Sequence, residues 1–479
     1  MEKPKMIKKP EMPANQANIF KNIKPRKQHI KNKKNKNITL NPGEKGNKKK
    51  LGQTLAYVLL LVFLVGFSAG CYDAVEIDQE VYALVIGVDK GVSNAIRITF
   101  QVPTYKGGGQ GGMAEGGGGG KDGETGELDG TVVSTVEAPS LIEAINMLNA
   151  TSNRTLSLSH AKLLVFSEEY AREGVGRYIE PLARFREVRE LMRVVICKGK
   201  AEDFIKENIP VIGQNISKEI ELSFLQSQNT AYFRDVFFTE FYIDLLSPYG
   251  QPTAIYAGVN DFTQMADSEP GQEAPLQTYL DIQPGLIPRK GGNKKEFFGT
   301  AVFDGDRMVG GLNPEESRFF LMAIGEFERS FFTLEDQDKP GYIYVIEVAA
   351  ESKPQISARF ADGVPAIDLR LKLDIDLASI QSRISYEKLG IIEGLEAYLE
   401  TYFQEGIKKT IEKTQREFKA DIFHFGRKVA GNFRTIQELK EYNWLQHYPE
   451  AKVNVTVKVN VRRSGYFYET HHIYSTKLK

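Results

Sequence analysis

The chain has 479 residues, enough for two or three domains, and its 62 basic and 62 acidic side chains balance to a net charge of zero. The balance is uneven, because residues 1–50 carry a net charge of +13 and residues 71–479 carry −13. An acidic main body excludes nucleic acid as its expected partner, since phosphate binding needs a basic face. Two cysteines are also too few for a disulfide framework.

The leading part of the chain predicts export. Residues 1–50 are rich in Lys, Asn and Pro, which predicts a disordered basic extension, either a cytoplasmic tail or the start of a signal peptide. Residues 51–70 contain no charged side chain and follow three lysines, the order typical of a signal peptide. The same twenty residues are also just long enough to span a bilayer. In both cases the positive-inside rule places the chain after residue 71 outside the cytoplasm.

The end of this segment, GFSAGC at residues 66–71, fits two motifs. Its first five letters match the G-x-S-x-G nucleophile elbow, but Ser68 lacks the strand before it, the helix after it and any nominated His and acid partners, so we do not expect catalysis there. The last four letters resemble a lipobox, although Leu is usual at position 68. This segment, 51–71, therefore predicts cleavage after Gly70 and a diacylglyceryl thioether on Cys71, an attachment that two acyl chains make stable. The alternative is an uncleaved transmembrane helix with an idle cysteine.

Residues 72–198 predict an N-terminal mixed α/β domain. Apolar residues alternate over 96–102, which indicates a half-buried strand, and residues 140–152 have the spacing of a helix. The glycine-rich run at 107–126 lacks the ending of a phosphate-binding loop and predicts a flexible loop. Cys197 lies in an apolar strand-like stretch and is expected to be a buried small hydrophobe.

The rest of the chain predicts a second kind of architecture. Residues 199–296 indicate a middle region of helices followed by loops, loop-rich near 250–290. The C-terminal domain, 297–479, begins with two short strands joined at FDGDR, where Asp-Gly suits a hairpin turn. Three further patterns follow, namely strict alternation at 367–377, helical spacing at 392–411 and alternation at 453–461. They predict a largely antiparallel sheet covered on one face by a long amphipathic helix, and a multi-domain α+β or mixed α/β chain overall.

No motif nominates a catalytic, cofactor-binding or metal-binding site. The sequence contains no H-E-x-x-H, C-x-x-C or EF-hand loop, and the adjacent His471 and His472 would point to opposite faces of a strand. Three acidic residues share the polar face of one alternating strand and are expected to be solvated: Asp368, Asp374 and Asp376. Arg462 and Arg463 end the last strand, and the sequence leaves open whether they are surface charge or an interface with a partner's acidic patch.

Several motifs follow one another along the chain after residue 70. The first is CYDAVEI at 71–77, and the next are RTLSLSHAKLLVFSEEYAREGVGRYIEPLAR, GTAVFDGDRMVGGL, KADIFHFGRKV, Trp444 and VNVTVKVNVRRSG. Their order resembles the Ger(x)C family, the lipoprotein C subunits of nutrient germinant receptors in spore-forming bacteria. That family begins its mature chain with Cys-Trp-Asp and a Glu-Ile soon after, and here these positions are Cys71, Tyr72, Asp73, Glu76 and Ile77. Tyr72 replaces Trp, and His424 stands where Gly is common.

The resemblance covers nearly all of residues 71–467 and implies three mixed α/β domains with no recognised enzymatic role. It implies a place on the outer face of the spore inner membrane, beside a multi-spanning A subunit and a transporter-like B subunit. Cys71 is the one functional residue that it carries over, as the lipid acceptor. We expect a non-catalytic receptor lipoprotein without a cofactor, and the nutrient that triggers the receptor is unassigned. The alternatives are a lipoprotein that delivers a small solute to a transporter and an exported hydrolase.

Overall fold

The computed structural model describes residues 54–61, 63, 77–94, 96–104, 127–128, 130–209, 215–264, 280–386, 388 and 390–463. The chain divides into two compact units, Met1–Ala74 and Val75–Lys479. In the first unit, residues 54–61 and 63 are helical. Within the described residues, no helix combines the length and the apolar character needed to cross a membrane. The predicted extension 1–50, Ser68, Gly70, Cys71 and the loop 107–126 lie outside the described residues.

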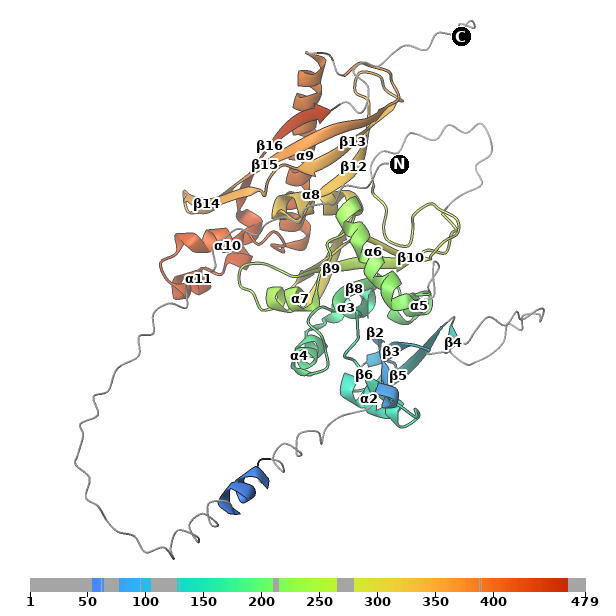
Figure 1. The fold of residues 1–479 in the computed structure, drawn as a ribbon. Coiled ribbons are helices and arrows are strands. Elements are labelled where there is room, and N and C mark those ends of the chain that lie inside the picture. The colour runs from blue at the N-terminus through green and yellow to red at the C-terminus, as the bar shows by residue number, and fades with distance from the viewer. Residues whose placement is uncertain are drawn as a thin grey trace, which may run out of the picture. The chain divides into compact units, whose positions relative to one another are not determined.

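The larger unit contains a nine-stranded mixed sheet (Figure 1). Its strands are β2 (Val85–Lys90), β3 (Ile96–Pro103), β4 (Glu127–Leu128), β5 (Thr131–Ala138), β7 (Leu163–Ser167), β8 (Arg193–Lys198), β9 (Thr253–Val259), β10 (Lys295–Asp304) and β11 (Arg307–Leu312). They lie in the order β11-β10-β9-β8-β7-β2-β3-β5-β4. The central strands β2, β7, β8 and β9 run parallel to one another, and the remaining pairs are antiparallel.

Helices cover both faces of this sheet, which is why β7 is buried along its whole length. One face packs against α2 (Leu141–Asn149), α3 (Glu168–Glu173), α4 (Gly176–Arg184) and α7 (Phe238–Leu245). The other face packs against α5 (Ala201–Lys206) and α6 (Ile216–Thr230). A short parallel pair, β1 (Glu80–Tyr82) and β6 (Thr155–Ser157), lies beside the sheet, and the turn η1 (Ile77–Gln79) precedes it.

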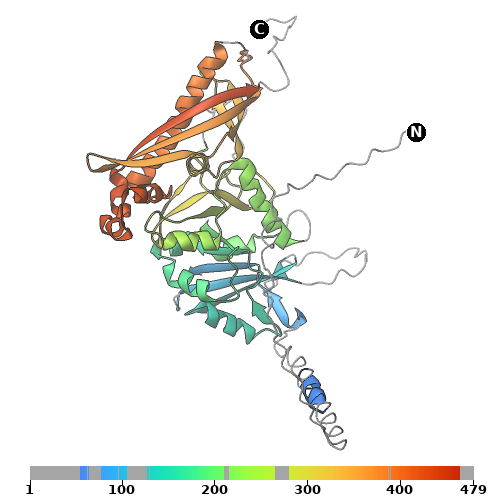
Figure 2. The same ribbon diagram turned by 60° about the vertical axis from the view of Figure 1, so that its left-hand side comes forward.

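A second sheet forms the C-terminal part, from β12 (Arg329–Glu335), β13 (Ile343–Ala350), β14 (Gln355–Ala361), β15 (Val364–Ile380) and β16 (Lys452–Arg463). The long helix α9 (Ile391–Lys413) lies across one face (Figure 2), and α8 (Pro314–Ile324) packs beside it. The predicted antiparallel sheet under one long amphipathic helix is confirmed, and with it the mixed fold class. One pairing differs from the antiparallel rule, because β16 lies parallel to β15 over eleven residue pairs.

Short elements join α9 to β16. They are the π-helical turn η2 (Thr414–Phe418), α10 (Gly426–Val429), η3 (Ala430–Asn432), α11 (Ile436–Tyr442), α12 (Trp444–His447) and η4 (Tyr448–Glu450). Their apolar side chains join the core under α9, so this connection is part of the packed C-terminal layer.

The predicted region 199–296 needs one correction. The stretch near 250 was expected to be loop, yet Thr253–Val259 forms β9, which is buried between β8 and β10. Flanking Gly and Pro residues suggested a loop, but pairing with strands distant in sequence outweighs that local signal. The large sheet takes strands from both sides of the predicted boundaries at 198/199 and 296/297, and the division into domains stays a prediction.

Candidate functional site

The carboxyl ends of β2, β7 and β8 meet at one edge of the large sheet, where a crevice of 490 Å³ opens. Its lining comes from these strand ends, the start of β3, the helix α3 and the turn before α5: Asp89, Lys90, Arg97, Ser167, Glu168, Glu169, Arg172, Gly199 and Lys200. The chain leaves β2 toward β3 on one side and leaves β7 toward β8 on the other, while α3 and α5 cover opposite faces. In open α/β sheets, ligands bind in the crevice at such a switch point. This crevice is therefore the candidate site.

Asp89, the buried residue near the end of β2, forms the base of the crevice. Its two carboxylate oxygens accept the backbone N–H groups of Ala201 at 2.8 Å and Glu202 at 2.9 Å. These are donors of the first turn of α5, which otherwise lack a partner. Burial raises the pKa of the Asp89 carboxyl, and the two backbone hydrogen bonds oppose that shift. The contact fixes the start of α5 to the end of β2, so the two walls of the crevice are held together.

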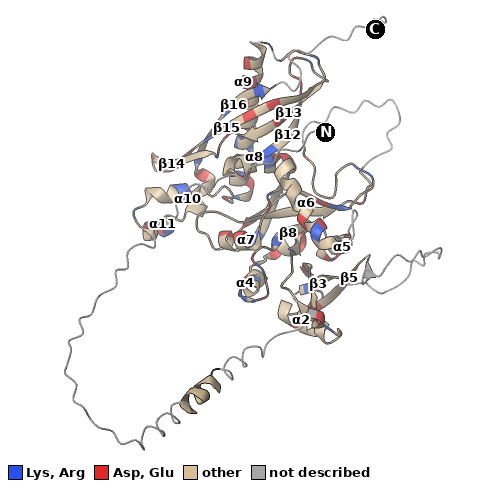
Figure 3. Cartoon of the chain, viewed as in Figure 1, with Lys and Arg blue, Asp and Glu red and all other residues tan. Residues whose placement is uncertain are grey.

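Charged side chains of both signs surround the mouth of the crevice. Arg97 pairs with Glu137 at 2.7 Å, and Arg172 pairs with Glu168 at 2.7 Å. Glu137 also accepts the backbone N–H groups of Ser93 and Val92, and these hydrogen bonds lower its pKa to about 2. Basic and acidic side chains are likewise interspersed on the elements around α5 and β8 (Figure 3). Such a surface can bind a small polar solute through groups of either charge.

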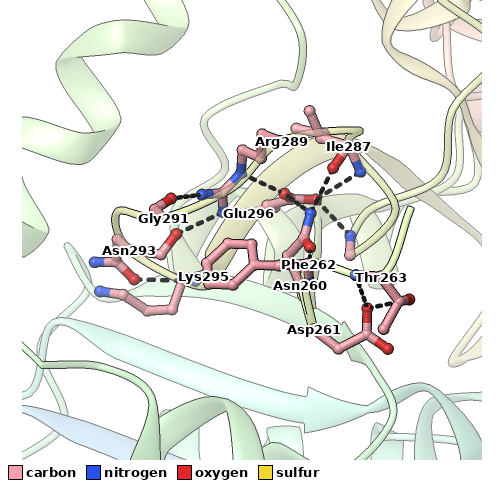
Figure 4. Close-up of polar contacts among 11 residues, drawn as sticks. Asn260, Asp261, Phe262, Thr263, Ile287, Arg289, Gly291, Asn293, Lys295 and Glu296 are labelled. Atoms are coloured by element: carbon pink, nitrogen blue, oxygen red, sulfur yellow. Dashed lines mark hydrogen bonds and ion pairs between the residues drawn. The ribbon is translucent and has the colours of Figure 1, made fainter. Parts of the chain in front are cut away.

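On the same edge, the described parts of the connection between β9 and β10, 260–264 and 280–294, are held by the buried carboxylate of Glu296 (Figure 4). This carboxylate accepts four donors, namely Asn260 Nδ2 at 2.5 Å, Gly285 N at 2.8 Å, Arg289 Nε at 2.8 Å and Ile287 N at 3.4 Å. Arg289 also donates to the carbonyl oxygens of Gly291 at 2.9 Å and Asn293 at 2.5 Å. Lys198, at the end of β8, donates to Gln283 at 2.5 Å. The described parts of this connection are therefore fixed to the sheet beside the crevice.

Lys295 precedes this carboxylate and is largely enclosed. Its ammonium donates to the side-chain oxygen of Asn208. Asn208 Nδ2 in turn donates to Gln101 Oε1 at 2.6 Å, and Nε2 of the fully buried Gln101 donates to the backbone carbonyl of Asn208 at 2.9 Å. Burial lowers the pKa of Lys295 to about 8, because the enclosed site disfavours the charged form. Sequence reasoning missed both Lys295 and Glu296, since nothing in the KKE triplet distinguishes them from surface charges.

A second buried cluster joins the large sheet to the C-terminal layer. The carboxylate of Asp244, in α7, lies 3.3 Å from Nε2 of His424 and 3.3 Å from Nη2 of Arg427. Nη1 of Arg234 lies 3.9 Å from the same carboxylate. His424 has φ of 56°, in the left-handed region that favours glycine. A side chain at this position therefore occupies a strained backbone conformation.

The structure also shows the surroundings of Cys197 and Arg462, two residues named from the sequence. Cys197 is fully buried and burial raises the pKa of its thiol, so its prediction as a small buried hydrophobe is confirmed. Arg462 pairs with Asp374 at 3.2 Å and approaches Asp376 at 3.7 Å, so its acidic partner lies in the same chain. In the described residues no group of three or more His, Cys, Asp or Glu is arranged to hold a metal ion. His471, His472 and the side chain of Arg463 lie outside the described residues.

Comparisons with known proteins cover most of the larger unit of the chain. The family described as "Spore germination protein N-terminal domain" matches residues 73–259, and "Spore germination B3/ GerAC like, C-terminal" matches 298–465. The chain is 21% identical over 418 residues to the putative spore germination protein YfkR of Bacillus subtilis (strain 168), covering 87% of this chain and 99% of the relative. It is 21% identical over 420 residues to the spore germination protein GerQC of Bacillus cereus, covering 86% and 98%. The crystal structure of the GerBC protein matches with 13% identity and a TM-score of 0.46, covering 78% and 96%.

Proposed function

Because the chain belongs to the Ger(x)C family of spore germination proteins, we propose that it is a lipid-anchored subunit of a spore nutrient germinant receptor. The observation that carries this proposal is the match of the two family models, one to residues 73–259 and the other to residues 298–465. In this role the chain acts without catalysis, by contacts with a multi-spanning A subunit and a transporter-like B subunit. Its place is the outer face of the spore inner membrane.

The anchor in this proposal is Cys71. Signal cleavage after Gly70 leaves Cys71 as the first residue, with a diacylglyceryl group on its sulfur and two acyl chains in the bilayer. Mass spectrometry of the N-terminal peptide from spore membranes tests this directly. A peptide that begins with the modified Cys71 supports the anchor, whereas a peptide that retains Gly70 before an unmodified Cys71 contradicts it.

The receptor role has a separate test. We expect an affinity-tagged chain to co-purify with A and B subunits from crosslinked spore membranes. Spores that lack the chain should lose the response to the nutrient and keep their response to a trigger that acts after the receptors. Equal loss of both responses would contradict a receptor role, because it would place the defect elsewhere in germination.

The crevice at the carboxyl ends of β2, β7 and β8, which we call the carboxyl-edge crevice, favours a second candidate function. In this function the chain is a lipoprotein that captures a small polar solute. Arg172→Glu reverses one charge of the crevice and breaks the pair with Glu168, while Arg184→Glu breaks the equivalent surface pair with Glu180 on α4. Calorimetry against the nutrients that trigger the spores distinguishes the two functions. Saturable binding that only Arg172→Glu abolishes supports solute capture. Absence of binding to the unmodified chain leaves the assembly role.

A further inference from the structure

A second pocket, of 460 Å³, opens at the opposite edge of the large sheet, where β3 ends and β5 begins. There β3, β5, β6 and α2 lie side by side (Figure 1). The pocket walls are mainly apolar, from Val81, Phe100, Val102, Val132, Leu148 and Leu156. Small-molecule sites have this size and this character, an apolar interior with a few polar groups. We call it the amino-edge pocket.

The polar groups of the amino-edge pocket are concentrated in the loop that follows α2. Arg154, in this loop, is exposed, and no carboxylate in the described part of the chain pairs with it. On either flank of the buried face of α2, Ile142 is 50% exposed and Met147 is 42% exposed. An apolar pocket with an unpaired cation at its rim suits a ligand that has a long aliphatic part and an anionic head. A phospholipid has both.

The position of the pocket in the chain identifies the source of such a ligand. Val81 lies in β1, the first strand after the apolar leading segment, and follows Cys71 by ten residues. Ten residues span at most about 34 Å when fully extended. A bilayer that holds Cys71 therefore lies within reach of the amino-edge pocket. This step rests on the proposed lipid anchor.

We propose that the amino-edge pocket binds one acyl chain of an anionic bilayer phospholipid, with Arg154 contacting the phosphate. Binding seats the molecule with its amino edge on the membrane. The carboxyl-edge crevice, at the other end of the same strands, then faces away from the bilayer.

Photocrosslinking of the full-length chain tests this assignment. The chain is reconstituted in vesicles of phosphatidylglycerol and phosphatidylethanolamine that contain a small fraction of phosphatidylglycerol with a diazirine near the end of one acyl chain. We expect crosslinks in the peptides that contain Val132 and Leu148. Ser134→Trp fills the pocket and should reduce these crosslinks at least five-fold. Thr135→Trp, the next residue of β5 with its side chain on the opposite face, should leave them unchanged.

A second pair of variants tests the headgroup contact without touching the core. Arg154→Gln should lower crosslinking by phosphatidylglycerol at least two-fold. The effect should be smaller with a zwitterionic phosphatidylcholine probe, because its choline ammonium offsets the charge of the phosphate that Arg154 contacts. Lys200→Gln, an exposed cation at the carboxyl edge, is the matched control and should change neither. Equal effects of Arg154→Gln on both probes would overturn the assigned anionic headgroup.

Two further outcomes also overturn the proposal. If Ser134→Trp leaves the crosslink yield unchanged, or if crosslinks spread evenly over both edges of the sheet, the lipid contacts the protein surface without entering the amino-edge pocket. Crosslinks that appear only after Cys71→Ser would show that the anchor's own chains fill the pocket. The proposed anchor fails by a different result, an unmodified Cys71 in the mass spectrum, and pocket crosslinks sensitive to Ser134→Trp would still support the lipid site.

Discussion

The indole Nε1 of Trp444 donates a 2.7 Å hydrogen bond to the carboxylate of Asp421, and both side chains are buried. The same carboxylate accepts the backbone N–H groups of Phe425 at 3.2 Å and Gly426 at 3.0 Å. Burial raises the pKa of Asp421, and these three donors oppose that shift. Two motifs that are separated in the sequence, KADIFHFGRKV and Trp444, thus form one structural unit.

Gly426 should not tolerate a side chain in this unit. A Cβ there would lie 2.3 Å from Trp444 Cδ1 and 2.4 Å from the carbonyl oxygen of Tyr249. We expect Gly426→Ala to lower the free energy of unfolding by about 1–3 kcal/mol through overpacking. Trp444 is the single tryptophan of the chain, so its fluorescence during chemical denaturation reports the change. Gly431→Ala is the control, because a Cβ there meets nothing within 4 Å. Equal stability of both variants would contradict this packing.

The left-handed backbone at His424 predicts a different pattern of substitutions. Asn tolerates φ near 56°, whereas a β-branched residue at that angle is strained. Both His424→Asn and His424→Val remove the contact of the imidazole with Asp244, so their difference isolates the backbone. We expect His424→Val to be less stable than His424→Asn by about 1–3 kcal/mol in urea unfolding. Equal values for the two variants would rule out a backbone cost.

The sequence predictions that the structure confirms rest on patterns within short stretches of the chain. The alternation at 367–377 and the helical spacing at 392–411 are visible within a few turns of chain, and the structure has β15 and α9 there. Nonlocal pairing is not visible in this way, so neither the parallel neighbour β16 nor the strand β9 followed from the residues alone. The carboxyl-edge crevice has the same origin. Asp89 and Ser167 lie at the ends of the apolar strands β2 and β7, Gly199 directly follows β8, and only the strand order brings them together.

The Glu296 carboxylate should control the order of the loop beside the crevice. Glu296→Ala leaves the N–H groups of Gly285 and Ile287 without their acceptor, and we expect a loss of about 1–3 kcal/mol in the free energy of unfolding. Hydrogen exchange of the amides in 280–289 should become faster in the native state. Glu335→Ala is the control, since its carboxylate accepts a loop N–H at the exposed Gly341 and should have a smaller effect. Unchanged hydrogen exchange in 280–289 would contradict this role of the Glu296 carboxylate.

The enclosed Lys295 predicts a rise in stability at alkaline pH. Its pKa is lowered to about 8 in the folded chain from the ordinary value of 10.5, so between these values the unfolded chain binds more protons. The free energy of unfolding should therefore increase from pH 8 to pH 10.5, by at most about 3–4 kcal/mol from this group. Lys295→Met removes the increase, and Lys294→Met, beside it, retains the increase because Lys294 pairs with Glu207 near the surface. An equal rise in both variants would assign it to other groups.

The two cysteines give a chemical test that links the fold to the anchor. Cys197 is fully buried and burial raises the pKa of its thiol, so the reactive thiolate is scarce and enclosed. We expect maleimide to leave Cys197 unmodified in the native protein and to modify it in denaturant. Val92→Cys, at a position that is 84% exposed, provides the positive control. A mature chain lipidated at Cys71 then shows no reactive thiol until it unfolds, whereas one thiol that reacts under native conditions at Cys71 would contradict the lipid anchor.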